Sequence, residues 1–497
     1  MTRSTEAAGA RAANDATARA ATILVFDQGT LVLDSPAAQP GGATERAAGR
    51  RGEPPGCELP GMLFDPRTDG FRAPAYFYAD LAAALAGGPS SISDAVLEDS
   101  GCEGWRDVGL RPYQQAALLA WRLADSRGVV VLPTGSGKTR LALAAMAGVG
   151  RSSLCIVPTR ALMHQWKQAL RAAYDGPIGV LGDAERSLAP VTVATFESAL
   201  RWMPRIGHRF RLLVVDEVHH FGTGRRDEAL EMCAAPLRLG LTATPAQEPA
   251  ALRIEERVGP VAYHLAIDDL AGRYLADFDT IVLRLQLDPD ERRAYETDVE
   301  IYRRALRHFH EVRPGGSWPE FVALAGRSQE GRAALSAWRR SQRMLALPRA
   351  KRHALEALLA RHRDNRVLVF TADNDSAYRI ARQELVMPLT CDIGRTEREA
   401  VLQAFREGRL RALVSSRVLN EGLDVPDADV AIITGGALGE REHVQRVGRL
   451  LRPRAGKRAT IYELVMRTTR EARQAARRRR GLGSPHAARL SSGSYPR

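Results

Sequence analysis

The sequence predicts an α/β protein built around two parallel β-sheets that follow one another along the chain. From about Trp105 onward, short apolar runs alternate with helical stretches, and strands separated by helices imply right-handed βαβ units. One strand-to-helix junction, VVLPTGSGKTRLAL, contains a glycine-rich turn. The expected strands form two sets, 128–132, 153–157, 191–195 and 211–216, followed by 366–370, 411–415, 429–433 and 459–464.

The glycine-rich turn at residues 133–139 predicts a phosphate site. A turn that opens a helix directs backbone N–H groups and the positive end of the helix dipole at one point, which attracts anions. Gly135 and Gly137 allow close approach of a phosphate, Lys138 can reach the β and γ phosphates, and the Thr139 hydroxyl can ligate Mg²⁺. Leu132 stands where the full motif has its first glycine, so a simple turn with a solvated lysine is the alternative. Only four of the 71 basic residues are lysines, and one of the four occupies this position.

Composition favours a polyanionic partner. The 497 residues carry a formal net charge of +13, although an arginine-rich proteome without any role in DNA binding would give the same excess. No apolar run is long enough to predict a membrane span. The five cysteines are scattered and form no C-x-x-C pair, so the sequence predicts neither a zinc site nor an iron–sulfur site. It predicts a reducing intracellular compartment.

Two carboxylates end the apolar strand at 211–216. In VVDEVHH, Asp216 can hold Mg²⁺ and Glu217 can orient an attacking water, whereas a solvated strand end is the alternative for a lone Asp-Glu pair. His219 and His220 lack an evident third metal ligand and are interpreted as polar couplers.

The second set contains EHVQRVGRLLRP, beginning at Glu442. If this segment is helical, Gln445, Arg449 and Arg452 share one face, and an arginine facing a γ phosphate stabilises transition-state charge. A basic surface helix is the alternative.

Nine segments in one order resemble the motifs of superfamily 2 helicases. They are LRPYQQ (110–115), PTGSGKT (133–139), VPTRAL (157–162), VATFES (193–198), DEVHH (216–220), LTATP (241–245), VLVFT (367–371), NEGLDVP (420–426) and QRVGRLLR (445–452). Within that superfamily the chain is most similar to the XPB family. The likeness rests on DEVHH, on the arginine-rich helical stretch that begins with LQLDPDERRAYE, on SSRVLNEGLDVPDADVAI with GRLLRPRAGKRATIYELV, and on residues 59–81, which resemble a damage-recognition domain.

The resemblance implies two RecA-like domains in tandem, a small N-terminal α+β domain and a helical thumb-like insertion. The implied divisions are a flexible tail (1–20), a DNA-binding domain (21–104), helicase domain 1 (105–265), helicase domain 2 (266–480) with its thumb at about 288–345, and a disordered tail (481–497).

The resemblance also implies the site residues. The cofactors would be ATP and Mg²⁺. The residues implied to bind the nucleotide are Arg111, Gln114, Thr134, Gly135, Ser136, Gly137, Lys138, Thr139, Gly422 and Asp424. The residues implied to bind the metal are Thr139 and Asp216. Those implied for catalysis are Lys138, Asp216, Glu217, Gln445, Arg449 and Arg452. Thr242 and Thr244 would couple hydrolysis to motion, and Pro158, Thr159, Arg160 and Thr195 would contact the DNA backbone.

By the same resemblance the protein is an ATP-dependent 3′–5′ DNA helicase or translocase that opens DNA in excision-type repair, in a bacterial, nucleoid-associated cytoplasmic setting. Single-stranded, forked or distorted DNA and a separate nuclease would be its partners. The family's Arg-Glu-Asp motif is replaced by the segment from Pro245 to Pro249, which puts strand separation in doubt. A translocase that does not separate strands and an ATP-gated clamp that recruits a nuclease therefore remain as alternatives.

The N-terminal segment FDPRTDGFRAPAYFYADL combines Arg67 and Arg72 with five aromatic residues, Phe64, Phe71, Tyr76, Phe77 and Tyr78. Aromatics can stack on exposed bases and arginines can neutralise phosphates. We expect at least half of these aromatics to be buried in a small core, with an accessible one available to read unstacked bases.

Overall fold

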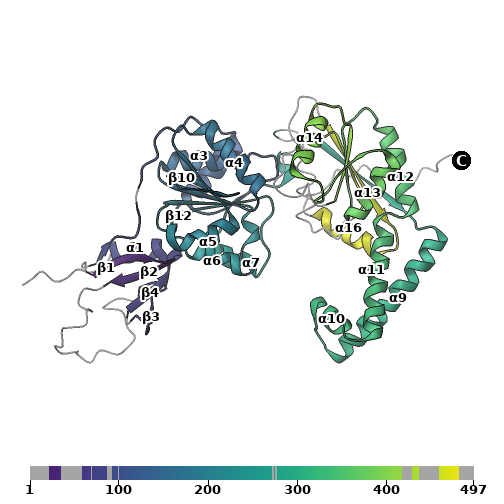
Figure 1. The fold of residues 1–497 in the computed structure, drawn as a ribbon, viewed down its shortest axis with the longest axis horizontal. Helices are drawn as coiled ribbons and strands as arrows, with labels where there is room; N and C mark the ends of the chain where they lie inside the picture. The colour runs from purple at the N-terminus through teal and green to yellow at the C-terminus, as the bar shows by residue number, and fades with distance from the viewer. Residues whose placement is uncertain are drawn as a thin grey trace, which may run out of the picture. The chain divides into compact units, whose positions relative to one another are not determined.

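The computed structural model describes residues 22–34, 59–68, 70–86, 92–98, 100–270, 274, 277–416, 428–435 and 458–480 (Figure 1). The chain divides into two compact units, one of residues 1–131 and 139–264 and the other of residues 132–138 and 265–497. The predicted tails, 1–20 and 481–497, lie outside the described residues.

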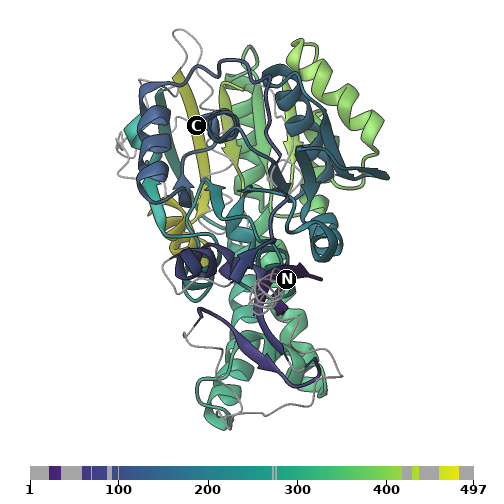
Figure 2. The same ribbon diagram turned by 90° about the vertical axis from the view of Figure 1, so that its left-hand side faces the viewer.

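The first unit begins with a five-stranded sheet in the order β3-β4-β2-β1-β5. Figure 2 shows strands of this sheet in purple. β1 and β2 form a hairpin through Gln28 and Gly29, both with positive φ, as a type I′ turn requires. Its elements are β1 (Thr22–Asp27), β2 (Thr30–Asp34), β3 (Leu63–Asp65), β4 (Gly70–Pro74), η2 (Ala75–Phe77), α1 (Tyr78–Ala86) and β5 (Ile92–Asp94).

An eight-stranded sheet follows, in the order β13-β6-β12-β11-β7-β10-β8-β9. All neighbouring strands are parallel except β8 and β9. The strands are β6 (Arg127–Val131), β7 (Ser153–Val157), β8 (Ile178–Gly182), β9 (Glu185–Ser187), β10 (Val191–Thr195), β11 (Leu212–Asp216), β12 (Leu237–Thr242) and β13 (Val261–His264). Every residue of β7, β10 and β11 is buried, as expected for strands covered on both faces.

Helices with apolar stripes cover this sheet. On α4, for example, Met163, Trp166 and Leu170 recur at helical spacing and are buried. The helical elements are α2 (Pro112–Leu123), α3 (Lys138–Val149), α4 (Arg160–Ala173), α5 (Phe196–Ile206), η3 (Val218–His220), η4 (Arg225–Asp227), α6 (Glu228–Glu231) and α7 (Ala250–Arg257).

The second unit is built on a six-stranded, all-parallel sheet in the order β14-β19-β18-β15-β17-β16. The strands are β14 (Asp277–Leu285), β15 (Val367–Phe370), β16 (Met387–Leu389), β17 (Ala412–Ser415), β18 (Val430–Ile433) and β19 (Arg458–Met466). The helices outside the insert are α8 (Ile267–Leu270), α12 (Arg349–Arg361), α13 (Asn374–Glu384), α14 (Arg395–Arg406) and α16 (Arg470–Arg480).

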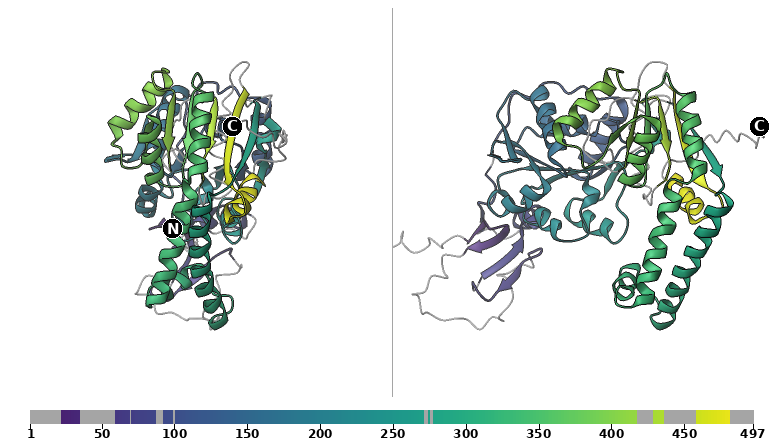
Figure 3. Two further views of the ribbon diagram at one scale, coloured as in Figure 1. Left: turned by 90° about the vertical axis from the view of Figure 1, so that its right-hand side faces the viewer. Right: turned by 45° about the vertical axis from the view of Figure 1, so that its right-hand side comes forward.

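A helical arm extends from the second sheet. α9 (Pro289–Val312) and α11 (Gln329–Ala346) run side by side, with α10 (Trp318–Ala325) near the far end of the pair, as Figure 3 shows. Tyr295, Val299 and Ala334 are buried in the contact between α9 and α11. The Arg340–Asp298 ion pair, at 2.6 Å, adds a polar link between the two helices. This arm occupies the position of the expected thumb-like insertion.

The predicted α/β class with tandem parallel sheets is confirmed, and all eight expected runs are strands. β12 was missed because Arg238 and Gly240 interrupt its apolar pattern. Arg238 is nevertheless fully buried, and its guanidinium donates to the carbonyls of Cys233, Ala235, Leu230 and Arg257. Burial lowers the pKa of Arg238 to about 10, which still leaves the guanidinium charged at neutral pH. The four carbonyls therefore provide the hydrogen bonds that a buried charge needs.

Candidate ATP and DNA site

Five adjacent strands of the eight-stranded sheet end at one edge, and predicted site residues lie at or directly after these strand ends. In parallel strands the carboxyl ends meet at the same edge, where ligands bind. The order β6-β12-β11-β7-β10 places the glycine turn after β6, Thr242 at the end of β12 and Asp216 at the end of β11. Residues 158–160 follow β7, and Thr195 ends β10. The predicted nucleotide residues and DNA residues therefore occupy neighbouring stretches of one edge.

The glycine turn has the backbone of a phosphate cradle. Gly135 and Gly137 have φ of +84° and +82°, a conformation that glycine adopts without strain. Lys138 opens α3, and its Nζ donates to the carbonyl of Leu132 at 3.2 Å. Ser136 is buried and its hydroxyl donates to the carbonyl of Pro133 at 2.6 Å, so its side chain braces the turn.

The oxygens near this turn fit Mg²⁺, which prefers carboxylate, hydroxyl and phosphate ligands. Thr139 is the second residue of α3, and Asp216 lies two strands away, at the end of β11. The buried hydroxyl of Thr134 has no hydrogen-bond partner among the described residues, so the turn holds an unsatisfied polar atom that a ligand could satisfy.

The carboxylate of Asp216 is held from two sides. Its Oδ1 accepts the backbone N–H of Glu217 at 3.0 Å, and its Oδ2 accepts the indole N–H of Trp166 at 2.8 Å. Burial, and then the charge of Asp216, raise the pKa of the Cys155 thiol, which keeps this neighbouring cysteine protonated. Sequence reasoning missed Trp166, because nothing in the spacing from Trp166 to Asp216 indicates a contact.

Glu217 has an unusual backbone. Its φ of +52° and ψ of +49° lie in the left-handed region, which costs a non-glycine residue roughly 1–2 kcal/mol. Such outliers concentrate at functional sites, where the surrounding structure holds them in place. The conformation turns the chain from the end of β11 into η3.

A polar chain connects the carboxylates to β12. His219 Nδ1 lies 3.4 Å from Glu217 Oε2 and 2.9 Å from the Thr242 hydroxyl. That hydroxyl donates to the carbonyl of Thr244 at 2.8 Å. His219 therefore joins the end of β11 to the Thr242–Thr244 segment. His220 stacks on His219, with ring centroids 4.5 Å apart.

The residues predicted to contact DNA lie at two helix starts. Thr159 is the N-cap of α4 and Thr195 the N-cap of α5, each accepting a backbone N–H three residues on. Arg160 is 73% exposed, and its guanidinium lies 3.3 Å from Asp183. Pro158 is half-buried before the cap. Two helix N-termini and an exposed arginine suit phosphate groups.

The predicted adenine contacts lie at the start of α2. Gln114 is buried, and its Oε1 accepts the backbone N–H of Arg111 at 2.9 Å, so the glutamine braces the helix start. Arg111 is exposed. The predicted residues Gly422, Asp424, Gln445, Arg449 and Arg452 lie outside the described residues.

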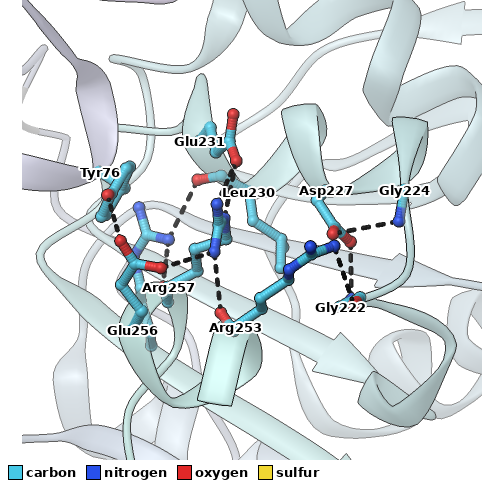
Figure 4. A network of polar contacts seen from close by, with 10 residues as sticks. Tyr76, Gly222, Gly224, Asp227, Leu230, Glu231, Arg253, Glu256 and Arg257 are labelled. Atoms are coloured by element: carbon cyan, nitrogen blue, oxygen red, sulfur yellow. Dashed lines mark hydrogen bonds and ion pairs between the residues drawn. The ribbon is translucent and has the colours of Figure 1, made fainter. Parts of the chain in front are cut away.

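A polar network on α7 joins the N-terminal sheet to the eight-stranded sheet (Figure 4). The Tyr76 hydroxyl donates to Glu256 at 2.9 Å, and Arg257 donates to Glu256 at 2.8 Å and to Glu231 at 2.7 Å. Burial first, and then the bond to Glu256, raise the pKa of Tyr76 to about 12. Both sheets belong to one compact unit, and these bonds are part of the reason.

The other end of the network reaches the loop that follows the two histidines. Arg253 lies one helical turn before Arg257 on α7, and its guanidinium lies 3.5 Å from the carbonyl of Gly222. The Gly222 N–H donates to Asp227 at 2.7 Å. The glycine and aspartate hold the loop between η3 and η4 against α7, as Figure 4 shows.

The expectation that at least half of the N-terminal aromatics are buried is wrong. Only Tyr76 and Tyr78 are buried, because the small sheet covers one face, whereas Phe71 and Phe77 are half-buried. Phe64 on the edge strand β3 is 41% exposed and is the accessible aromatic.

The two arginines of this segment are already engaged within the domain. Arg67 contacts Asp65 at 2.9 Å, and Arg72 contacts Asp27 at 2.5 Å. Hydrogen bonds from Arg67 lower the pKa of Asp65. A phosphate at either arginine would compete with a carboxylate of the same sheet.

The histidines, cysteines and carboxylates in the described part of the chain form no group of three or more that could hold a metal ion. None of its helices combines the length and the apolar character needed to cross a membrane.

Three family models match successive parts of the chain. They are the Xeroderma pigmentosum group B helicase damage recognition domain (residues 24–96), the Type III restriction enzyme, res subunit (107–247), and the Helicase conserved C-terminal domain (350–454). The Pyrococcus furiosus Hef helicase domain has a similar fold, with a TM-score of 0.51 at 18% identity over 74% of this chain and 97% of that one.

Among relatives, the DNA 3′-5′ translocase XPB2 of Sulfurisphaera tokodaii is 34% identical over 84% of this chain and 96% of its own length. The DNA 3′-5′ helicase XPB of Mycobacterium tuberculosis is 31% identical over 76% of this chain, which spans 64% of that relative. The order of motifs, the two parallel sheets and the N-terminal domain agree with these similarities. The chain belongs to the XPB family of superfamily 2 ATP-dependent DNA helicases.

Proposed function

We propose that this protein couples ATP hydrolysis to 3′–5′ movement along one DNA strand and opens DNA for repair. The observation that supports this most directly is the order β6-β12-β11-β7-β10, which supplies nucleotide and DNA residues to one sheet edge. In this proposal the glycine turn and Lys138 hold the β and γ phosphates, while Thr139 and Asp216 hold Mg²⁺. When bound, Mg²⁺ would supply positive charge that neutralises the charge developing on the phosphate oxygens.

The remaining roles follow from position and chemistry. Glu217 orients the attacking water, and Arg111 with Gln114 contacts adenine. Gln445, Arg449 and Arg452, with Gly422 and Asp424, are further candidate residues for nucleotide binding and hydrolysis. His219 contacts both Glu217 and Thr242, so a movement of Glu217 during hydrolysis is transmitted to the Thr242–Thr244 segment, which precedes α7. Phosphate contacts at Thr159, Arg160 and Thr195 give a grip that does not depend on sequence.

The first experiment measures DNA-stimulated ATPase of Lys138→Ala. Because Lys138 is the lysine of the phosphate turn, the variant should lose ATPase and keep DNA binding. Lys167→Ala is the matched control, since Lys167 is a lysine on α4 whose ammonium contacts Glu185 at 2.8 Å. ATPase near the wild-type rate in Lys138→Ala would overturn the site.

The loss of the Arg-Glu-Asp motif favours a second candidate, movement on duplex without strand separation. Gln247 and Glu248 of the replacement segment are exposed, so this segment is available to DNA. A strand-displacement assay run beside a triplex-displacement assay separates the candidates. Release of a strand supports a helicase, release of the triplex strand alone supports a translocase, and neither supports a clamp.

For the partner we propose a separate nuclease acting on the opened DNA, because the described residues contain no metal-binding cluster for cutting. The proposed setting is the nucleoid of a bacterial cytoplasm. Crosslinking of the tagged protein to chromosomal DNA, followed by identification of co-purified proteins, tests both.

A further inference from the structure

We propose that Trp166 is a positioning residue that links DNA binding at the start of α4 to the Mg²⁺-binding carboxylate of Asp216. The inference rests on the proposed function, because it assumes DNA at Arg160 and Mg²⁺ at Asp216. What it adds is a physical connection between the two sites, through one helix and one hydrogen bond.

The connection at Asp216 is direct. Trp166 is 1% exposed, and its indole N–H lies 2.8 Å from Asp216 Oδ2. An indole N–H can only donate, so this bond favours the ionised carboxylate and fixes its rotation. The Glu217 N–H holds the other oxygen, Oδ1, at 3.0 Å. Since a carboxylate oxygen can accept more than one hydrogen bond, neither contact prevents ligation through water.

The connection to DNA runs along α4. Arg160 is the first residue of the helix, and Trp166 lies six residues later, about 9 Å along the helix axis. Thr159 caps the helix through its bond to the Leu162 N–H, which ties residues 158–160 to the first turn. Met163, Trp166 and Leu170 pack this face of α4 into the core. A phosphate that shifts the capped first turn therefore shifts the indole with it.

Strand order makes the same route short. β7, which leads into α4, pairs with β11, which ends at Asp216. The proposed DNA residues follow β7, and the proposed metal ligand Asp216 ends the neighbouring strand β11. Trp166, on the helix after β7, donates a hydrogen bond to Asp216 and so connects the two strand ends. A small rotation of the indole changes the direction in which Asp216 presents its oxygens. Removing a residue that hydrogen-bonds to a metal ligand commonly lowers metal affinity or activity by about 10–100-fold. We expect an effect of this order when the indole N–H of Trp166 is removed.

The test is a Mg²⁺ titration of nucleotide binding in the full-length protein. The Mg²⁺ concentration for half-maximal binding of a fluorescent ADP analogue is measured with and without an oligo(dT) strand. Trp166→Phe removes the N–H and keeps an aromatic ring, and it should raise that concentration about tenfold. In the wild type, DNA should lower the concentration, whereas Trp166→Phe should not respond to DNA.

Trp121→Phe is the matched control. Trp121 is also 1% exposed in the same unit, and its N–H donates to a backbone carbonyl, that of Arg238, at 2.9 Å. The control loses the same atoms and one hydrogen bond but does not touch Asp216. It should bind nucleotide with wild-type dependence on Mg²⁺ and DNA. Trp166→Met, which also fills a core without an N–H donor, is used if the phenylalanine variant does not fold.

Each result decides something. A wild-type Mg²⁺ dependence in Trp166→Phe overturns the positioning role. A raised Mg²⁺ requirement with an intact response to DNA overturns the link to α4. Asp216→Asn is run in parallel, and a wild-type Mg²⁺ dependence in that variant would instead overturn the proposed metal site. Failure of the inference is therefore distinguishable from failure of the proposed function.

Discussion

The hydroxyl of Tyr76 donates a 2.9 Å hydrogen bond to Glu256, which joins residues 180 positions apart. Tyr76 lies between β4 and α1 of the N-terminal sheet, and Glu256 lies on α7, the helix after the Thr242–Thr244 segment. Gly29 adds a second close contact, because a Cβ at that position would lie 2.5 Å from Met232. The N-terminal sheet is thus attached to α7, the helix that follows the Thr242–Thr244 segment.

Tyr76→Phe should destabilise this attachment. The free energy of unfolding should fall by about 1.5 kcal/mol, the lower end of the range for a hydrogen bond to a charged group. The lower end applies because the Glu256 side chain is half-exposed to solvent. Hydrogen exchange should increase across η2 and α7 together. Tyr78→Phe is the control, since Tyr78 donates to Asp94 at 2.6 Å within its own sheet.

The raised pKa of Tyr76 predicts a dependence on alkaline pH. The folded state holds the phenol proton more tightly than the unfolded chain does, since the pKa of Tyr76 is about 12 against an ordinary value of 10.0. The stabilisation is therefore complete below pH 10.0 and is lost as the pH rises towards 12. Thermal unfolding of wild type and Tyr76→Phe should converge over that range, and parallel curves would contradict the assignment.

Glu217→Gln should bind ATP but hydrolyse it far more slowly. The amide keeps the size of the side chain and its left-handed backbone, yet it orients water poorly. Turnover should fall more than tenfold, which is about 1.4 kcal/mol of barrier. The exposed Glu228→Gln serves as control, and a smaller loss in Glu217→Gln would show that another group orients the water.

Phe64→Ala should reduce the preference for forked DNA over plain duplex. Stacking of a base on an aromatic ring is worth about 1–3 kcal/mol, so fork affinity should fall by roughly fivefold or more. Leu63→Ala is matched, because Leu63 is 72% exposed on the same strand and has no ring. Both affinities must be measured at one salt concentration. Equal fork-to-duplex ratios in the two variants would exclude Phe64 as a reader of unstacked bases.

Lys351→Met should destabilise the second unit. Lys351 is fully buried and donates to Glu471 at 2.7 Å and to the carbonyl of Leu345. Removing one partner of a buried ion pair leaves a charge in the interior, which costs about 3–5 kcal/mol. Urea unfolding measures the loss. Arg409→Met, which breaks the exposed pair with Glu407, should cost no more than about 1 kcal/mol.

The sequence by itself determined the fold class and the phosphate turn, because both depend on short-range patterns. Apolar runs such as SLCIV and VTVAT are long enough to be buried strands, and each occupies its predicted residues as β7 and β10. The turn from Pro133 to Thr139 is likewise contiguous, and its two glycines have the positive φ angles that the local pattern predicts.

Strands with mixed composition escaped sequence reasoning. Arg238 within β12 looks like a surface residue, and only the fold provides the four carbonyls that allow its burial. The extent of aromatic burial in the N-terminal sheet also depended on how much of that sheet another element covers. Such properties arise from packing between distant segments, which no local pattern specifies.

Tertiary structure alone decided the contacts that connect the sites. Trp166 and Asp216 are 50 residues apart, and Tyr76 and Glu256 are 180 apart. A hydrogen bond needs donor and acceptor within about 3 Å, a condition set by strand order and helix packing. The sequence therefore determined which chemical groups are present, and the order β6-β12-β11-β7-β10 decided which of them meet.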